Sequence, residues 1–300
     1  MKKKTYLLAL MAMALALGSC SDNENGIGGE ASKYITVSTN IGSMTRVATD
    51  ADGSQTFEEG DKISVYAWTG EATVAPETRE RVVNNAINKL TNGSWVSNPQ
   101  MLWKNNRDKH YFIGVYPISA ISDLSAGEYA FDETKQVESD LLVAVNKDGL
   151  SYNVDEQQTV PLTFTHVMAK LVVNLTYKNQ WGGIPTVEKV VVGNAAKEAT
   201  INYLTKVVTP STTAKEDFSL PEITENSKYV SVIIPQEEVK QLTIVIGGKN
   251  FVYDNGTPFK LESGKITTVN LEVGRDEIKL GDVKITNWEN GSTFSGEALN

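Results

Sequence analysis

The chain has 300 residues, of which 40% are apolar and 22% are charged, and its formal net charge is -9. This composition is typical of a folded protein rather than a disordered one, and the length suits two domains of ordinary size. The acidic excess disfavours nucleic acid as a partner, because it would repel the phosphate backbone. The sequence holds one cysteine, which excludes an intrachain disulfide and a multi-cysteine metal cluster.

The N-terminal residues resemble a bacterial lipoprotein signal. Lysines at residues 2–4 precede an apolar run at residues 6–17, which is too short to serve as a transmembrane helix. The segment Leu17-Gly18-Ser19-Cys20 resembles a lipobox, the signal at which a peptidase cuts before the cysteine that then carries acyl chains. We therefore expect lipid attachment, including palmitate, at Cys20 and anchoring to a membrane surface. The alternative is a plain secretory signal with an incidental cysteine.

The remaining sequence has the pattern of a β protein. Its apolar segments are short and rich in Val, Ile, Thr and aromatic residues, as strands prefer, and residues 35–41 alternate with a period of two. We expect strands at residues 34–41, 63–68, 111–116, 141–145, 162–177, 187–192, 230–234, 242–246, 251–253, 267–273 and 283–288. The Asn92-Gly93 turn favours a hairpin over a helix for the stretch at residues 77–90. Many short strands with regular turns predict sandwiches or barrels.

One predicted strand changes its phase. Phe164 and Met168 share one parity within residues 162–177, whereas Leu171 and Val173 share the other. A bulge or bend near Ala169 would reconcile the two patterns.

The sequence offers little that could carry catalysis. His110 and His166 lack the spacing of zinc ligands, and the glycine-rich turns lack the spacing of a phosphate loop. We therefore predict no enzymatic activity, no catalytic residues, no metal site and no cofactor. Trp68, Trp95 and Trp103 are expected to fill a core. Trp181, beside two glycines, is the candidate for an exposed aromatic residue that recognises glycan or protein.

Motifs in both halves, taken together, resemble the fimbrillin-like family. They are Gly60-Asp61-Lys62-Ile63-Ser64-Val65-Tyr66, Leu102-Trp103, Tyr111-Phe112-x-x-Val115-Tyr116-Pro117, Phe164-x-His166-x-Met168-Ala169-Lys170-Leu171, Ile234-Pro235-Gln236, Thr268-Val269-Asn270-Leu271 and Val283-x-Ile285-x-x-Trp288. The resemblance covers nearly the whole chain. It implies two tandem transthyretin-like β-sandwich domains.

The resemblance also implies a function and its site residues. Members are subunits, anchors or tip adhesins of lipoprotein-derived fimbriae, or related outer-membrane surface lipoproteins. In structural subunits an arginine-specific protease removes the first strand, and the matching place here is between Arg46 and Val47. A C-terminal strand of another subunit then fills the opened groove, and Val283, Ile285 and Trp288 are the candidate donor residues. The implied partners are other fimbrial subunits and a host protein or glycan receptor.

The expected divisions follow from these signals. They are a signal peptide at residues 1–19, a tether with the removable strand at 20–46, an N-terminal sandwich at 47–158 and a C-terminal sandwich at 159–300. The alternative function is a non-polymerising surface lipoprotein of the outer membrane that binds glycan or protein. In that case both terminal strands simply complete their own sandwiches.

Overall fold

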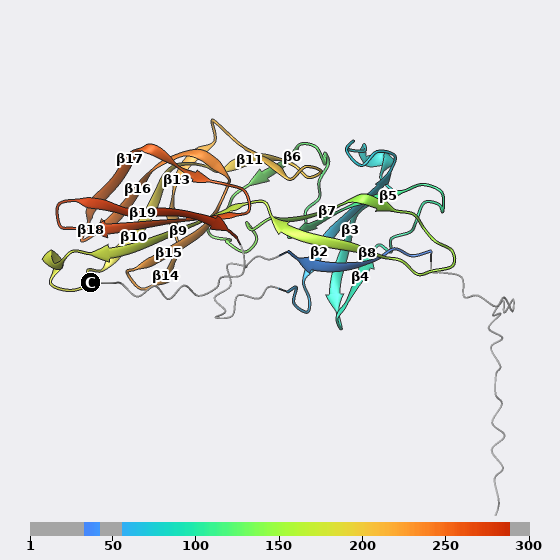
Figure 1. Cartoon of the computed structure of the whole chain (residues 1–300), viewed down its shortest axis with the longest axis horizontal. Coiled ribbons are helices and arrows are strands. Elements are labelled where there is room, and N and C mark those ends of the chain that lie inside the picture. Colours follow the sequence, from blue (N-terminus) through green and yellow to red (C-terminus); the bar gives the residue numbers. More distant parts are fainter. Residues whose placement is uncertain (1–32, 43–55, 289–300) are drawn as a thin grey trace, which may run out of the picture.

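The computed structural model describes residues 33–42 and 56–288. Strands dominate these ranges, whose only helical elements are the single 3-10 turns η1 (Thr78–Glu80) and η2 (Asn179–Trp181). Within the described residues no helix is long and apolar enough to cross a membrane. The four sheets form sandwich-like layers in two bodies that lie end to end (Figure 1), which confirms the prediction of an all-β protein.

The first body is built on a seven-stranded sheet. Its order is β1 (Thr36–Ile41), β8 (Thr159–His166), β7 (Leu142–Leu150), β5 (His110–Tyr116), β2 (Lys62–Thr69), β3 (Val83–Thr91) and β4 (Ser94–Asn98). The sheet curves so strongly that its two edge strands, β1 and β4, lie against each other. The curved face encloses an apolar core that includes Val65, Phe112, Leu162 and Phe164.

The predicted hairpin is confirmed at β3 and β4. Asn92 and Gly93 join the two strands with φ angles of 50° and 74°. Two-residue hairpin turns whose residues both have positive φ match the twist of the strands they connect, and Asn-Gly adopts them readily. The preceding stretch contains only η1 before β3 begins.

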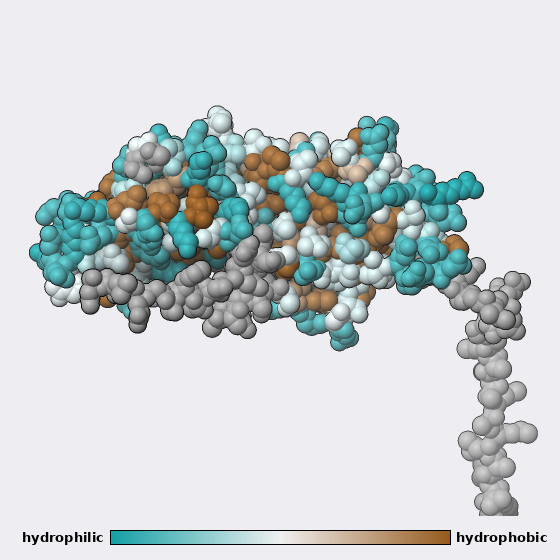
Figure 2. Space-filling model, in the orientation of Figure 1, coloured by the Kyte–Doolittle hydropathy of each residue, from teal (hydrophilic) through white to brown (hydrophobic). Residues whose placement is uncertain are grey.

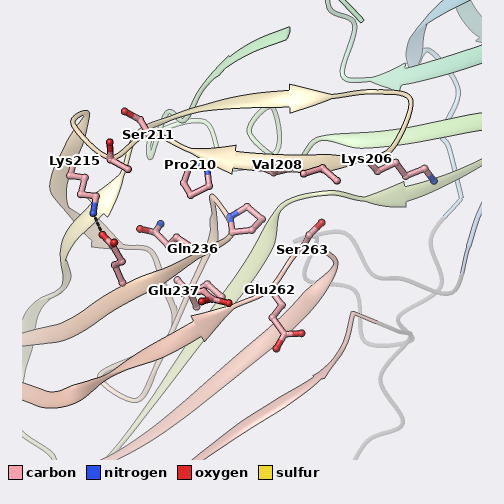
Figure 3. A pocket seen from close by; sticks show the side chains of 14 residues that line it. Lys206, Val208, Pro210, Ser211, Lys215, Gln236, Glu237, Glu262 and Ser263 are labelled. Atoms are coloured by element: carbon pink, nitrogen blue, oxygen red, sulfur yellow. Dashed lines mark hydrogen bonds and ion pairs between the residues drawn. The ribbon is translucent and has the colours of Figure 1, made fainter. Parts of the chain in front are cut away.

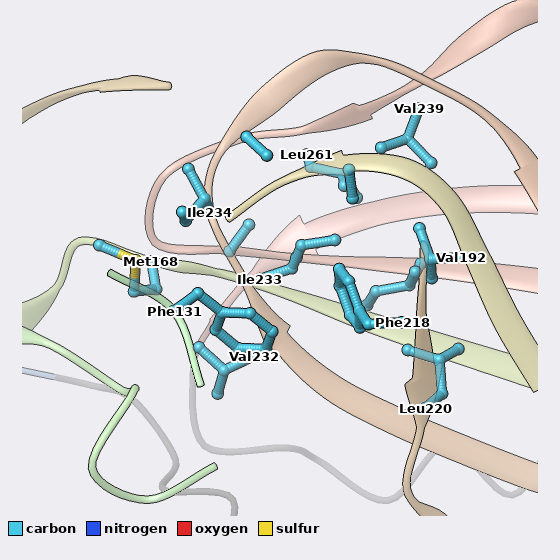
Figure 4. Close-up of a cluster of buried hydrophobic side chains, with 14 of the residues drawn as sticks. Phe131, Met168, Val192, Phe218, Leu220, Val232, Ile233, Ile234, Val239 and Leu261 are labelled. Atoms are coloured by element: carbon cyan, nitrogen blue, oxygen red, sulfur yellow. The ribbon is translucent and has the colours of Figure 1, made fainter. Parts of the chain in front are cut away.

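The second body is a sandwich of two sheets. The five-stranded sheet has the order β14 (Glu222–Thr224), β15 (Lys228–Ile233), β9 (Ala169–Tyr177), β18 (Lys265–Val273) and β19 (Ile278–Asn287). The four-stranded sheet has the order β13 (Lys215–Leu220), β10 (Val187–Ala196), β16 (Gln236–Ile246) and β17 (Lys249–Leu261). Apolar side chains such as Val192, Phe218 and Ile233 fill the space between them (Figure 4).

A small fourth sheet, of three strands, ties the two bodies together. Its order is β12 (Val207–Pro210), β11 (Glu198–Asn202) and β6 (Gly127–Ala130), so a strand from the first half of the sequence pairs with one from the second. A Cβ at Gly127 would lie 2.5 Å from the Tyr203 ring, so this close approach requires glycine. Tyr66 and Ile113, on the outer face of the first sheet, join the core of the second body. The bodies therefore share packed surface.

The phase change in residues 162–177 marks a change of sheet. Strand β8 ends at His166 and β9 begins at Ala169, and the two strands belong to different bodies. Phe164 accordingly packs in the first core and Leu171 in the second. The division expected before residue 159 needs correction in this respect, because β8 is hydrogen-bonded to β1 and β7 in the first sheet. The backbone passes from one sheet to the other at Val167 and Met168.

Candidate functional site

Strand β1 is an edge strand that pairs in a different direction from the other strands of its sheet. It runs parallel to β8, in register from Thr36–Thr159 to Ile41–Phe164, while the other pairings of this sheet are antiparallel. Its ends are held by backbone bonds from the Ile35 amide to the Met101 carbonyl (3.0 Å) and from the Gly42 amide to the Phe164 carbonyl (3.0 Å). Every ladder bond that β1 makes in the described ranges therefore goes to a single strand.

The dependence is mutual, because the first half of β8 is paired with β1 alone among the described strands. Strand β7 pairs with β8 only from Phe164 to His166. Residues 159–163 have β1 as their ladder partner, and Pro161 among them has no N–H to donate. Removing β1 would leave this part of β8 as an unpaired edge.

The inward face of β1 covers the apolar core of the first body. Ile35, Val37 and Ile41 are buried, as the alternation predicted. Burial of each such side chain contributes about 1.5–3 kcal/mol. Beside β1, and between it and β4, lies a groove of about 740 Å³ that Phe57, Leu90 and Trp95 help to line. Loss of β1 would widen this groove and expose the core to water.

Strand β19 carries two of the three predicted donor residues and is the edge of the five-stranded sheet, and the third, Trp288, follows it directly. Val283 and Ile285 pair with Val269 and Thr267 of β18, yet each remains 39% exposed. Apolar surface is visible over this side of the second body (Figure 2). Trp288 differs from the other two, because it is fully buried and its amide donates to the Gly264 carbonyl at 3.1 Å.

The indole of Trp288 covers a buried hydrogen-bonded pair. Its ring stacks on His166 with centroids 4.0 Å apart, and the His166 Nδ1 lies 2.6 Å from Asp140 Oδ1. The Lys170 ammonium lies 5.4 Å from the centre of the Trp288 ring. Burial lowers the pKa of Lys170, although the Asp140 charge opposes this shift. Because the indole lies over the face of the imidazole, His166 and Asp140 hold Trp288, and with it the end of β19, in place.

The surroundings of His110, the other histidine, indicate a structural role. It is fully buried, and its Nε2 accepts a hydrogen bond from the Lys104 amide at 3.0 Å while its Nδ1 faces the Asp108 carbonyl at 3.1 Å. This pattern fits a neutral ring with the proton on Nδ1. Burial lowers the pKa of His110 accordingly. In the described part of the protein no three His, Cys, Asp or Glu side chains gather as metal ligands.

Trp181 lies in η2, at a loop of the second body. Its indole N–H donates to the Val273 carbonyl at 2.9 Å, and its ring meets the edge of Phe251 with centroids 5.7 Å apart. The Arg275 guanidinium lies 5.9 Å from the ring centre. The ring is therefore half-buried and anchored, with only part of it open to a ligand.

A second hollow lies where the three-stranded sheet meets the sandwich. It measures about 540 Å³, and Figure 3 shows Val208 and Pro210 of β12 across it from Gln236 and Glu237 at the start of β16. The Gln236 side chain already has partners within the protein. Its Oε1 accepts a hydrogen bond from the Ala196 amide at 3.0 Å, and its Nε2 donates one to the Ile234 carbonyl at 3.0 Å. No sequence motif indicated this hollow, because its walls come from separate strands.

The remaining predicted site residues lie outside the described ranges. They are Cys20, the proposed lipid attachment residue, and Arg46 and Val47, which flank the proposed cleavage site. The sequence nevertheless places Arg46 and Val47 in the connection between β1 and β2, so a cut there would separate β1 from the rest of the protein.

The curved sheet of the first body, with its groove beside β1, and the sandwich of the second body define a tandem all-β protein. A family model described as fimbrillin-like matches residues 45–288. The chain therefore belongs to the fimbrillin-like family, as its motifs indicated. No curated protein matches the chain.

Solved structures share the fold at low sequence identity. A candidate cell adhesion protein from Bacteroides ovatus has a TM-score of 0.64 and 17% identity, with 87% of this chain and 100% of that chain covered. A second candidate cell adhesion protein, from Bacteroides uniformis, has a TM-score of 0.63 and 18% identity, covering 87% and 98%. A fimbrial protein from Bacteroides vulgatus has a TM-score of 0.50 and 12% identity, covering 75% and 92%.

Proposed function

We propose that this protein is a fimbrial subunit or an accessory or tip adhesin that reaches the outer membrane as a lipoprotein. In this account acyl chains at Cys20 hold the precursor at the cell surface. Cleavage between Arg46 and Val47 then frees β1, and a strand of another subunit takes its place. Family membership supports the fimbrial role, and the lipobox supports the route of export.

One observation carries the strand-exchange step. Strand β1 is an edge strand whose ladder bonds all go to β8, and the segment that connects it to β2 contains Arg46. A single cut would therefore convert a covalently attached strand into one held by non-covalent contacts alone. An unpaired edge above an apolar groove is a ready template for another strand.

The candidate donor strand is β19. Its position at a sheet edge and its exposed Val283 and Ile285 suit a strand that can leave its own body. Trp288 opposes that departure, because its buried ring must first leave His166. Donation by β19 therefore requires the release of one aromatic anchor as well as the ladder with β18.

Proteolysis of the purified protein tests the proposal. The sequence has five arginines, and the triple variant Arg79→Lys, Arg107→Lys and Arg275→Lys leaves only Arg46 and the buried Arg81. An arginine-specific protease should give a product that begins at Val47 and assembles into larger species on size-exclusion chromatography. The matched Arg46→Ala variant should remain uncut and monomeric. A product that stays monomeric under all conditions would refute assembly by strand exchange.

The second candidate function is a non-polymerising surface lipoprotein that binds glycan or protein. The observation that favours it is the 540 Å³ hollow beside β12, which no part of the strand-exchange account uses. Trp181 offers a second recognition surface through the open part of its ring. Binding on a glycan array that is lost in Trp181→Ala, but retained in Trp181→Phe, would support this candidate for the Trp181 loop.

A further inference from the structure

One side chain of the first body makes a directional contact with the inward face of β1. The indole Nε1 of Trp95, in β4, donates a hydrogen bond to Thr39 Oγ1 at 2.9 Å. Thr39 lies between the buried residues Val37 and Ile41 on the same face of the strand. Strand β1 thus presents a hydroxyl flanked two residues away on each side by an apolar side chain.

The indole ring also has a packing partner outside β1. Phe57 meets the Trp95 ring edge-on with centroids 5.2 Å apart, and it packs in the same way against Phe164 at 5.2 Å and Tyr116 at 5.5 Å. All four aromatic residues follow Arg46 in the sequence. The cluster therefore stays with the groove after β1 has been cut from the protein.

We propose that Trp95 is a specificity-determining residue of the groove, which selects an incoming strand with Ser, Thr or Asn at the position of Thr39. This inference rests on the proposed strand exchange and names the chemistry of the partner strand. A strand with valine at this position would fill the same space but leave the indole N–H without its acceptor. A donor that loses its acceptor weakens binding, and at this half-buried site we expect the affinity to fall roughly five- to tenfold.

Peptide exchange into the cleaved protein tests the inference. The full-length triple variant Arg79→Lys, Arg107→Lys and Arg275→Lys is cut after Arg46, which leaves β1 bound without a covalent link. Fluorescent peptides covering residues 33–42 are then added, and their binding is followed by anisotropy. The series comprises the native peptide and its Thr39→Ser and Thr39→Val forms. Each peptide is measured with the native groove and with Trp95→Phe.

The expected result is specific to the hydrogen bond. The native groove should bind the Thr and Ser peptides about equally and the Val peptide roughly five- to tenfold more weakly. The Trp95→Phe groove should bind all three alike. Equal binding of the Thr and Val peptides by the native groove would overturn the inference, and this comparison stands even if Trp95→Phe fails to fold.

The specificity of Trp95 and strand exchange itself can be refuted separately. If peptides exchange but the groove does not distinguish valine from threonine, the specificity of Trp95 is refuted and strand exchange stands. Persistent discrimination in Trp95→Phe would likewise refute the role of Trp95. If no peptide enters the cleaved protein, strand exchange itself is refuted, and the inference falls with it.

Discussion

Trp288 and His166 stack with their ring planes 12° apart and their centroids separated by 4.0 Å. Trp288 follows the edge strand β19, and His166 is the last residue of β8, the strand that pairs with β1. The candidate donor end and the candidate acceptor strand therefore touch within one subunit. This contact adds to the energetic cost of freeing β19 from its ladder with β18.

We predict that Trp288→Ala destabilises the protein strongly. The indole is fully buried, and removal of such a side chain typically costs about 3–5 kcal/mol through lost burial and the cavity left behind. Chemical denaturation gives the free energy of unfolding. Ile285→Ala is the matched control in the strand just before Trp288, and its cost should be smaller because Ile285 is 39% exposed. Equal losses for the two variants would show that Trp288 is no special anchor.

Gly114→Ala should disturb the strand that holds β1. A Cβ at Gly114 would lie 2.6 Å from Phe164 Cζ and 3.1 Å from Leu162 Cδ1, so both β8 side chains must move. Overpacking of this kind costs about 1–3 kcal/mol. The measurement is the midpoint of urea unfolding. Gly42→Ala is the control, because its Cβ would make ordinary contacts of 3.5 Å and longer, and it should be nearly neutral.

The buried His110 predicts a pH dependence of stability. Burial lowers its pKa in the folded state below the ordinary value of 6.5, so the unfolded state binds more protons between the two values. The contribution of neutral, buried His110 to the free energy of unfolding is complete above pH 6.5. It declines as the pH falls from 6.5 through the lower pKa of the folded state. His110→Gln removes this titration. The free energy of unfolding should therefore fall less steeply below pH 6.5 in the variant, and identical slopes would contradict the assignment.

The sequence predicted the strand content because local signals were strong. Ile35, Val37 and Ile41 alternate as an edge strand with one buried face requires, and Asn92-Gly93 specified its hairpin. The strands that were missed lack such patterns. Strand β13 begins with Lys-Glu-Asp, and β14 is exposed throughout, so neither has a continuous apolar face.

Long-range pairings could not be predicted in this way. The parallel contact of β1 with β8 and the pairing of β6 with β11 join segments far apart in the sequence, and periodicity carries no information about partners. The role of Trp95 was missed for the same reason. It was expected to be a core residue, and only the curvature that brings β4 against β1 places its N–H on Thr39.

The central claim is that the protein is processed before it functions in a filament. The most direct measurement is the N-terminal residue of the protein recovered from assembled cell-surface filaments, determined by mass spectrometry. The account predicts Val47 for subunits within the filament, with Cys20 and its acyl chains absent. Filament subunits that still begin at acylated Cys20 would contradict it.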